Sequence, residues 1–163
     1  MHPSLRFYAT VAPLCVLLAL TACSKRNDAY PQPAVVASWT IDGQERTSIL
    51  ARAETNFDKV NVYIYQNTMG PNSSGTQVAV SLSMPKSIGT HAIGTNSQAQ
   101  ATFIDLGTST GPNGEPYTAE SSSVTISTLT ATSVSGTFTL TGRGYLNKQL
   151  TKTVTNGKFI ATL

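Results

Sequence analysis

Apolar side chains recur at every second residue through most of the chain after Val35. In the stretch KVNVYIYQ, Val60, Val62 and Ile64 would share one face of an extended strand. Side chains of a strand point alternately to its two faces, whereas a helix repeats every 3.6 residues, so this spacing favours strands. Threonine is abundant, while the helix formers leucine, lysine and glutamate are sparse. We therefore predict an all-β domain over residues 35–163, with no helix.

Turn-forming pairs separate these strand-like runs. Asp42-Gly43 predicts a two-residue hairpin, because both turn positions need a positive φ that these residues tolerate. Asn156-Gly157 predicts either a last hairpin or a bulge in one long terminal strand, and the sequence leaves both open. Gly136 stands inside a strand pattern, which indicates a bulge or a close approach of another backbone.

The spacing of the strands predicts how they are connected. We count about 8 to 10 strands between the turn signals. Because the links between successive strands are short, an antiparallel meander is the simplest topology. Such a meander would form either a sandwich or a barrel. Trp39 is expected to anchor its core.

Residues 1–22 have the features of an export signal. His2 and Arg6 precede an apolar stretch from Val11 to Leu20. A helix of that length would span about 15 Å at ~1.5 Å per residue, which is half of the roughly 30 Å of bilayer hydrocarbon. The stretch is therefore too short for a permanent membrane span, and we exclude it from the fold.

The signal ends in Leu20-Thr21-Ala22-Cys23, which resembles the lipobox of bacterial lipoproteins. In that family the cysteine is acylated and the chain is cut just before it, so the resemblance implies a lipid on Cys23. Several acyl chains give a stable anchor, because each buried methylene contributes about 0.8 kcal/mol. Residues 24–34 carry charges and prolines without an apolar period, which is typical of a flexible tether.

The mature chain carries a second resemblance in its strand and turn segments. WTIDG stands near its start, and SSVTIS, SGTFTLTG and KTVTNGKF follow later. In this order the segments resemble a family of small uncharacterised lipoproteins of Bacteroidota-type bacteria, catalogued as a domain of unknown function. The resemblance implies a location and a fold, and it supplies no catalytic residue.

The residues after Cys23 indicate which membrane the lipid enters. Ser24 is not the aspartate that commonly retains lipoproteins in the inner membrane, which favours the outer membrane. Surface-exported lipoproteins of the resembling group tend to carry acids here, whereas Lys25 and Arg26 come before Asp28. We predict an outer-membrane lipoprotein, and the sequence leaves open which side of the membrane the domain faces.

Few residues of the mature chain suit catalysis or metal binding. Cys15 lies in the signal and Cys23 carries the lipid, so no thiol remains for a disulfide, a metal or a nucleophile. His91 is the one histidine after the signal, and the sequence has no HExxH pair. The charges, +3 in net at pH 7, are scattered and form no basic stripe for nucleic acid. We therefore predict a non-enzymatic protein with no cofactor, no metal and no nucleic-acid partner.

Acidic residues provide the enzymatic alternative. Asp105, Glu115 and Glu120 flank a Gly/Pro-rich loop, where two converging carboxylates could hydrolyse a glycosidic bond. The same loop could hold calcium through Asp105, Asn113 and Glu115, although its acids lack the alternate spacing usual in calcium loops. The simpler interpretation is a solvated loop.

Tyrosines are the best candidates for a ligand-binding surface. Tyr63 and Tyr65 would lie side by side on one strand face, and Tyr117 comes from a later strand. Such rings could stack on a sugar or another flat ligand, or they could fill the core instead. We predict a lipid-anchored binding or structural module whose partner is a glycan or another envelope protein. The alternatives are a barrel that carries a small apolar ligand inside and a carboxylate-dependent hydrolase that uses loop 105–120.

Overall fold

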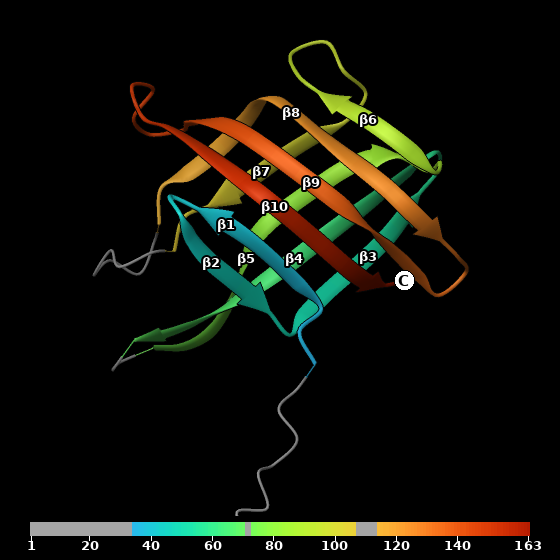
Figure 1. The fold of residues 1–163 in the computed structure, drawn as a ribbon, viewed down its shortest axis with the longest axis horizontal. Helices are drawn as coiled ribbons and strands as arrows, with labels where there is room; N and C mark the ends of the chain where they lie inside the picture. Colours follow the sequence, from blue (N-terminus) through green and yellow to red (C-terminus); the bar gives the residue numbers. More distant parts are fainter. Residues whose placement is uncertain (1–33, 71–72, 107–113) are drawn as a thin grey trace, which may run out of the picture. The chain divides into compact units, whose positions relative to one another are not determined.

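The computed structural model describes residues 34–70, 73–106 and 114–163, and for side chains it leaves out residues 67–76 as well. These ranges contain ten strands and no helix (Figure 1). The strands are β1 (Ala37–Ile41), β2 (Gln44–Ser48), β3 (Leu50–Asn56), β4 (Lys59–Gly70), β5 (Ser73–Pro85), β6 (Gly89–Ile93), β7 (Gln100–Ile104), β8 (Pro116–Leu129), β9 (Ser133–Gly144) and β10 (Thr151–Thr162). The prediction of an all-β fold is confirmed. Within the described part of the chain, no helix has the length and apolarity to cross a membrane.

Seven of the strands close into a barrel. The ring runs through β3, β4, β5, β7, β8, β9 and β10, and returns to β3. Its neighbours are antiparallel except β10 and β3, which run parallel where Thr162 pairs with Arg52. An odd number of strands cannot alternate direction all the way round a closed ring, so one parallel pair is required. Of the two predicted architectures, the chain therefore forms the barrel.

The remaining strands, β1, β2 and β6, extend this ring. β1 pairs with β10 and β2, and β2 leads through Ile49 directly into β3. At this junction the hydroxyl of Ser48 is buried and accepts the N–H of Leu50 at 3.0 Å. The same hydroxyl lies within hydrogen-bond distance of the carbonyl oxygens of Leu50 and Tyr65. Because a buried hydroxyl needs such partners, Ser48 fixes the junction between the two strands.

Two predicted turn signals have different outcomes. Asp42 and Gly43 have φ values of +52° and +74° and join β1 to β2, which confirms the hairpin. Asn156 also has a positive φ of +54°, but β10 continues through it. The register of β10 against β9 shifts between Val154 and Gly157, so this pair forms a bulge rather than a hairpin.

Apolar side chains from the strands fill the barrel. The largest fully buried ones are Tyr117, Phe103, Phe159, Ile41, Ile64, Leu82, Met84, Ile126, Leu140, Val60, Val62 and Val80. Trp39 belongs to the same core and is only 2% exposed, as predicted. The rings of Phe103 and Tyr117 stack with their centroids 5.1 Å apart and their planes 10° from parallel. With the interior occupied in this way, a binding surface is to be sought at the ends and on the outside of the barrel.

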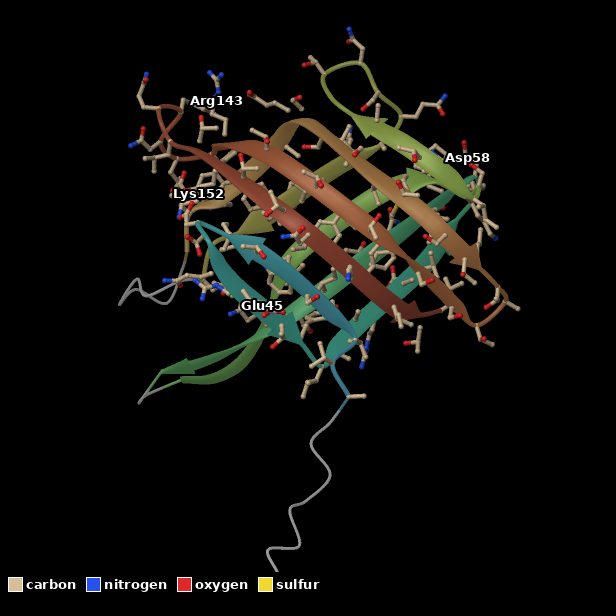
Figure 2. The ribbon with its side chains drawn as sticks, in the orientation of Figure 1. Glu45, Asp58, Arg143 and Lys152 are labelled. Atoms are coloured by element: carbon tan, nitrogen blue, oxygen red, sulfur yellow. The ribbon has the colours of Figure 1, made fainter. Side chains whose placement is uncertain are left out.

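The barrel has two ends, which differ in the connections they carry (Figure 1). At one end lie the β3–β4 and β5–β6 turns. The chain enters β1 between the two ends, where Ile160 donates its N–H to the carbonyl of Val36 at 2.8 Å. At the loop end lie the β1–β2 hairpin, the chain between β7 and β8, and loop 145–150. Figure 2 shows Asp58 and Lys152 at these opposite ends.

Candidate binding site

A pocket opens near the loop end, where β5 and β7 diverge. The pairing of these strands stops at Val80 and Phe103, and beyond it β7 continues with β8 alone, through Ile104 and Pro116. The space between β5 and the β7–β8 pair forms a pocket of about 360 Å³. This volume falls in the range of roughly 300 to 1,000 Å³ that is typical of small-molecule sites.

The floor and walls of the pocket are apolar. The stacked pair Phe103 and Tyr117 lies at its base, with Val78 and Ala79 on the β5 side. Ala79 is an extra residue of β5, because Ile64 of β4 pairs with Val80 and the next residue, Tyr65, pairs with Val78. Such a bulge bends a strand and ends its regular pairing locally, which accounts for the divergence of β5 at this point.

The rim of the pocket is polar but uncharged. Ser81, Thr102 and Thr118 contribute one hydroxyl each from three adjacent strands, because alternate residues of those strands face outward. Tyr145, 64% exposed, completes the rim from the loop after β9. No charged residue is among the described residues that line the pocket.

Loop 145–150 holds Tyr145 in a fixed position. The Oε1 atom of Glu115 accepts the backbone N–H of Leu146 at 2.8 Å and that of Asn147 at 3.0 Å. Tyr145 itself donates its N–H to the carbonyl of Pro116 at 2.8 Å. These bonds tie the loop to the first residues of β8 and place an exposed aromatic ring beside the pocket.

Four charged side chains lie together at the loop end, and we call Asp42, Arg46, Asp105 and Lys152 the mouth cluster. The Nζ atom of Lys152 donates to Asp42 Oδ2 at 2.5 Å and to Asp105 Oδ2. Arg46 Nη2 lies 3.8 Å from Asp105 Oδ1, and Arg46 Nε is buried with no hydrogen-bond partner in the described part of the chain. The side chains of Lys152 and Asp105 are 24% and 15% exposed, so water screens their pairing only in part.

The strand pattern explains why these charges meet. Lys152 precedes Val154 by two residues on the inward face of β10, and Arg46 precedes the buried Ser48 in the same way on β2. Asp105 follows the inward-facing Phe103 by two residues. The inward rows of β2, β7 and β10 thus each carry a charge near the loop end, where the barrel meets water.

The mouth cluster changes how two nearby groups ionise. The hydrogen bond from Lys152 to Asp105, followed by that to Asp42, raises the pKa of Lys152 well above its ordinary value. Burial is the largest cause that raises the pKa of Tyr117, and the nearby Lys152 opposes it. At neutral pH Lys152 is therefore a cation and Tyr117 a neutral phenol.

The structure separates the three tyrosines that the sequence suggested. Tyr117 is buried and forms part of the pocket floor. Tyr63 and Tyr65 are half-buried on the outer face of β4, where they pair with Arg52 and Leu50 of β3, and they do not line the pocket. Arg46 and Lys152 were not among the site residues predicted from the sequence.

The acids near the 105–120 loop bind different partners. Asp105 belongs to the mouth cluster, whereas Glu115 accepts backbone N–H groups of loop 145–150. Glu120 lies 3.3 Å from Arg143 Nε, and both side chains are 52% exposed. The third suggested calcium ligand, Asn113, lies outside the described residues. Among those that are described, no three or more His, Cys, Asp and Glu side chains are grouped so as to hold a metal ion.

Comparison with known proteins gives no relative for this chain, since no family model, curated protein or solved structure matches it. The resemblance to the two lipoprotein groups therefore stays a prediction. So does the lipid on Cys23, which lies outside the described residues. Function has to be inferred from the barrel and its pocket.

Proposed function

We propose that the protein is a lipid-anchored, non-enzymatic binding module of the bacterial outer membrane. Its pocket between β5 and the β7–β8 pair would bind a neutral, ring-shaped ligand such as a sugar unit of an envelope glycan. The lining of the pocket carries this proposal, since an apolar floor is combined there with an uncharged hydroxyl rim.

A sugar ring suits this lining on chemical grounds. Its C–H face is apolar and stacks on aromatic side chains, and the exposed ring of Tyr145 offers such a surface at the rim. Its hydroxyl groups need partners that both donate and accept hydrogen bonds, as the hydroxyls of Ser81, Thr102 and Thr118 do. A charged ligand would find no opposite charge in this lining.

The ionisable groups support a binding role over catalysis. A general acid or base works best when its pKa lies near the operating pH. Lys152 has a raised pKa and is hydrogen-bonded to Asp42 and Asp105, so it stays protonated. The filled interior likewise favours binding at the barrel's surface over carriage of an apolar ligand inside it.

Replacing Cys23 tests the lipid anchor. Cys23→Ala should abolish labelling by radioactive fatty acid and leave a precursor that retains residues 1–22, because the acylated sulfur is the substrate of the processing step. Labelling followed by mass spectrometry of the N-terminus measures both effects. If the variant were cleaved and released like the parent protein, the anchor would be disproved.

Blocking the pocket tests the binding site. Thr102→Trp places a large ring on the pocket rim without entering the core, because Thr102 is exposed. We expect saturation-transfer NMR with the disaccharide of N-acetylglucosamine to show binding to the parent protein. The variant should bind at least roughly tenfold more weakly, a loss of about 1.4 kcal/mol.

The matched control for this experiment is Thr139→Trp, which adds the same ring to an exposed position of β9 away from the pocket. This control should bind the disaccharide like the parent protein. Equal binding by Thr102→Trp and the parent would exclude this pocket as the site, and no saturation transfer to the disaccharide from the parent protein would refute the proposed ligand class.

A further inference from the structure

Two rows of outward-facing side chains cross the strands that form the pocket. In the first row, which we call the hydroxyl row, each residue pairs with the next across neighbouring strands. It consists of Ser81, Thr102 and Thr118. The second row, which we call the apolar row, lies two residues nearer the loop end. There Ile104 pairs with Pro116, and Val78 lies across the pocket from them on β5.

Both rows continue into a tyrosine on β4. Tyr63 pairs with Ser81 of the hydroxyl row. Tyr65 pairs with Val78 of the apolar row. Both side chains lie half-buried on the outer face of the strand, two residues and so about 7 Å apart. We call Tyr63 and Tyr65 the tyrosine pair, and it extends the surface of the pocket by one strand.

Only β5 separates the tyrosine pair from the centre of the pocket. Neighbouring strands lie about 4.8 Å apart. Thr102, in the middle of the hydroxyl row, is two strands from Tyr63 and therefore roughly 10 Å from it. A sugar ring bound over Thr102 would leave the tyrosine pair free, whereas a chain of sugars that leaves the pocket over β5 would meet both rings.

The surface between the pocket and the tyrosine pair suits a neutral chain. The hydroxyl row is bounded by Arg52, which pairs with Tyr63, and by Arg143, which pairs with Thr118. The four residues that lie between these arginines are uncharged, and each carries a hydroxyl group. A glycan chain presents hydroxyl groups and apolar C–H faces along its whole length, so it can hydrogen-bond to the row and stack on the tyrosines.

We propose that the tyrosine pair is a second sugar subsite, and that the protein binds its glycan as a chain that crosses β5 from the pocket to β4. This inference rests on the proposed function, because the pocket holds one part of that chain. It narrows the ligand class to an oligosaccharide or polysaccharide that is recognised over several sugar units.

The length of the sugar chain tests the second subsite. The disaccharide and the tetrasaccharide of N-acetylglucosamine are titrated separately into the full-length protein, and calorimetry measures the two affinities. The tetrasaccharide should bind at least about fivefold more tightly, which is the contribution of one stacked aromatic ring. Equal affinities would overturn the second subsite and leave the pocket intact. If neither sugar bound, the proposed function would fail, and this inference with it.

Replacing the two rings tests whether the tyrosine pair supplies the gain. When Tyr63→Thr and Tyr65→Thr are combined, the tetrasaccharide should bind no more tightly than the disaccharide, whose own affinity should not change. Threonine favours strands and leaves the inward side chains unchanged, so the barrel should still fold. The combination of Tyr63→Phe and Tyr65→Phe keeps both rings and should keep most of the gain. A gain that persisted in the threonine variant would refute the subsite.

Phe57→Asn is the control for the loss of any exposed ring. Phe57 is 96% exposed in the β3–β4 turn, away from both rows, and asparagine tolerates its φ of +51°. Both affinities should equal those of the parent protein. A loss of the tetrasaccharide's gain in this variant would mean that exposed aromatic rings bind the sugar unspecifically, against the assignment to the tyrosine pair.

NMR of the parent protein gives a second measurement that needs no variant. The ring resonances of Tyr63 and Tyr65 should shift on addition of the tetrasaccharide and stay unchanged with the disaccharide. The resonances of Tyr145, at the rim of the pocket, should shift with both sugars. Shifts at Tyr145 alone with both sugars would overturn the second subsite, even if the threonine variant did not fold.

Discussion

Gly136→Ala should lower the free energy of unfolding by about 3 kcal/mol, at the upper end of the range for overpacked sites. A Cβ atom at this position would lie 2.0 Å from the carbonyl oxygen of Thr125 and 3.1 Å from the ring of Phe159. The Thr125 oxygen belongs to the backbone of β8, which pairs with β9 along most of its length, so it cannot move aside alone. This geometry confirms the predicted close approach at Gly136.

Gly94→Ala is the matched control for this substitution. A Cβ atom added at Gly94 would have the carbonyl oxygen of Glu120 as its nearest neighbour, at 3.3 Å. Both substitutions stiffen the unfolded chain alike, by about 0.4 to 1 kcal/mol, so the difference between the variants isolates the steric clash. Urea unfolding followed by circular dichroism measures both. A midpoint for Gly136→Ala equal to that of the parent protein would contradict the close approach.

The fold was predictable from local sequence because both of its main determinants are local. Alternation of apolar residues fixes which side chains face inward, as Val60, Val62 and Ile64 do. The positive φ at Asp42-Gly43 likewise depends on those residues alone. Closure of the ring is not a local property, because it depends on the pairing of Arg52 with Thr162, which is distant in the sequence.

The bulge and the pocket floor show where local patterns were not sufficient. Asn156-Gly157 fits a hairpin or a bulge equally well, and the register of β9 against β10 decides between them. Tyr117 was a candidate for a surface ring, but it falls on the same face as Ala119, the inward face of β8. Its burial therefore follows from the alternation of inward and outward side chains along β8, once the first residue of that strand is known.

The mouth cluster was missed for a related reason. Lys152 reaches Asp42 and Asp105 across sequence separations of 110 and 47 residues, which no local pattern records. A signal was nevertheless present, because Lys152 and Arg46 each continue an inward row of their strand by one step. A charge in that position needs a partner, and the sequence could have predicted the need but not which carboxylates supply it.

Lys152→Met should lower the free energy of unfolding by about 2 kcal/mol, between the small effect of an exposed ion pair and the large effect of breaking a buried one. The substitution keeps the length of the side chain and removes the cation that holds Asp42 and Asp105 together. Asp105, 15% exposed, would keep Arg46 at 3.8 Å but lose its nearest cation. Lys158→Met is the control, because Lys158 lies exposed on the same strand and should change stability by less than about 0.5 kcal/mol.

The difference in the free energy of unfolding between the parent protein and Lys152→Met should depend on pH, and this dependence identifies its electrostatic origin. The folded state raises the pKa of Lys152 above the ordinary value of 10.5, so it holds the proton more tightly than the unfolded chain does. The stabilisation is therefore complete below pH 10.5 and is lost as the pH rises toward the raised pKa. Urea unfolding should give a constant gap between the parent protein and Lys152→Met from pH 7 to about pH 10, and a shrinking gap above it. A gap that stayed unchanged at high pH would mean that Lys152 stabilises the barrel through packing of its stem, because only the loss of a charge can make the two proteins converge.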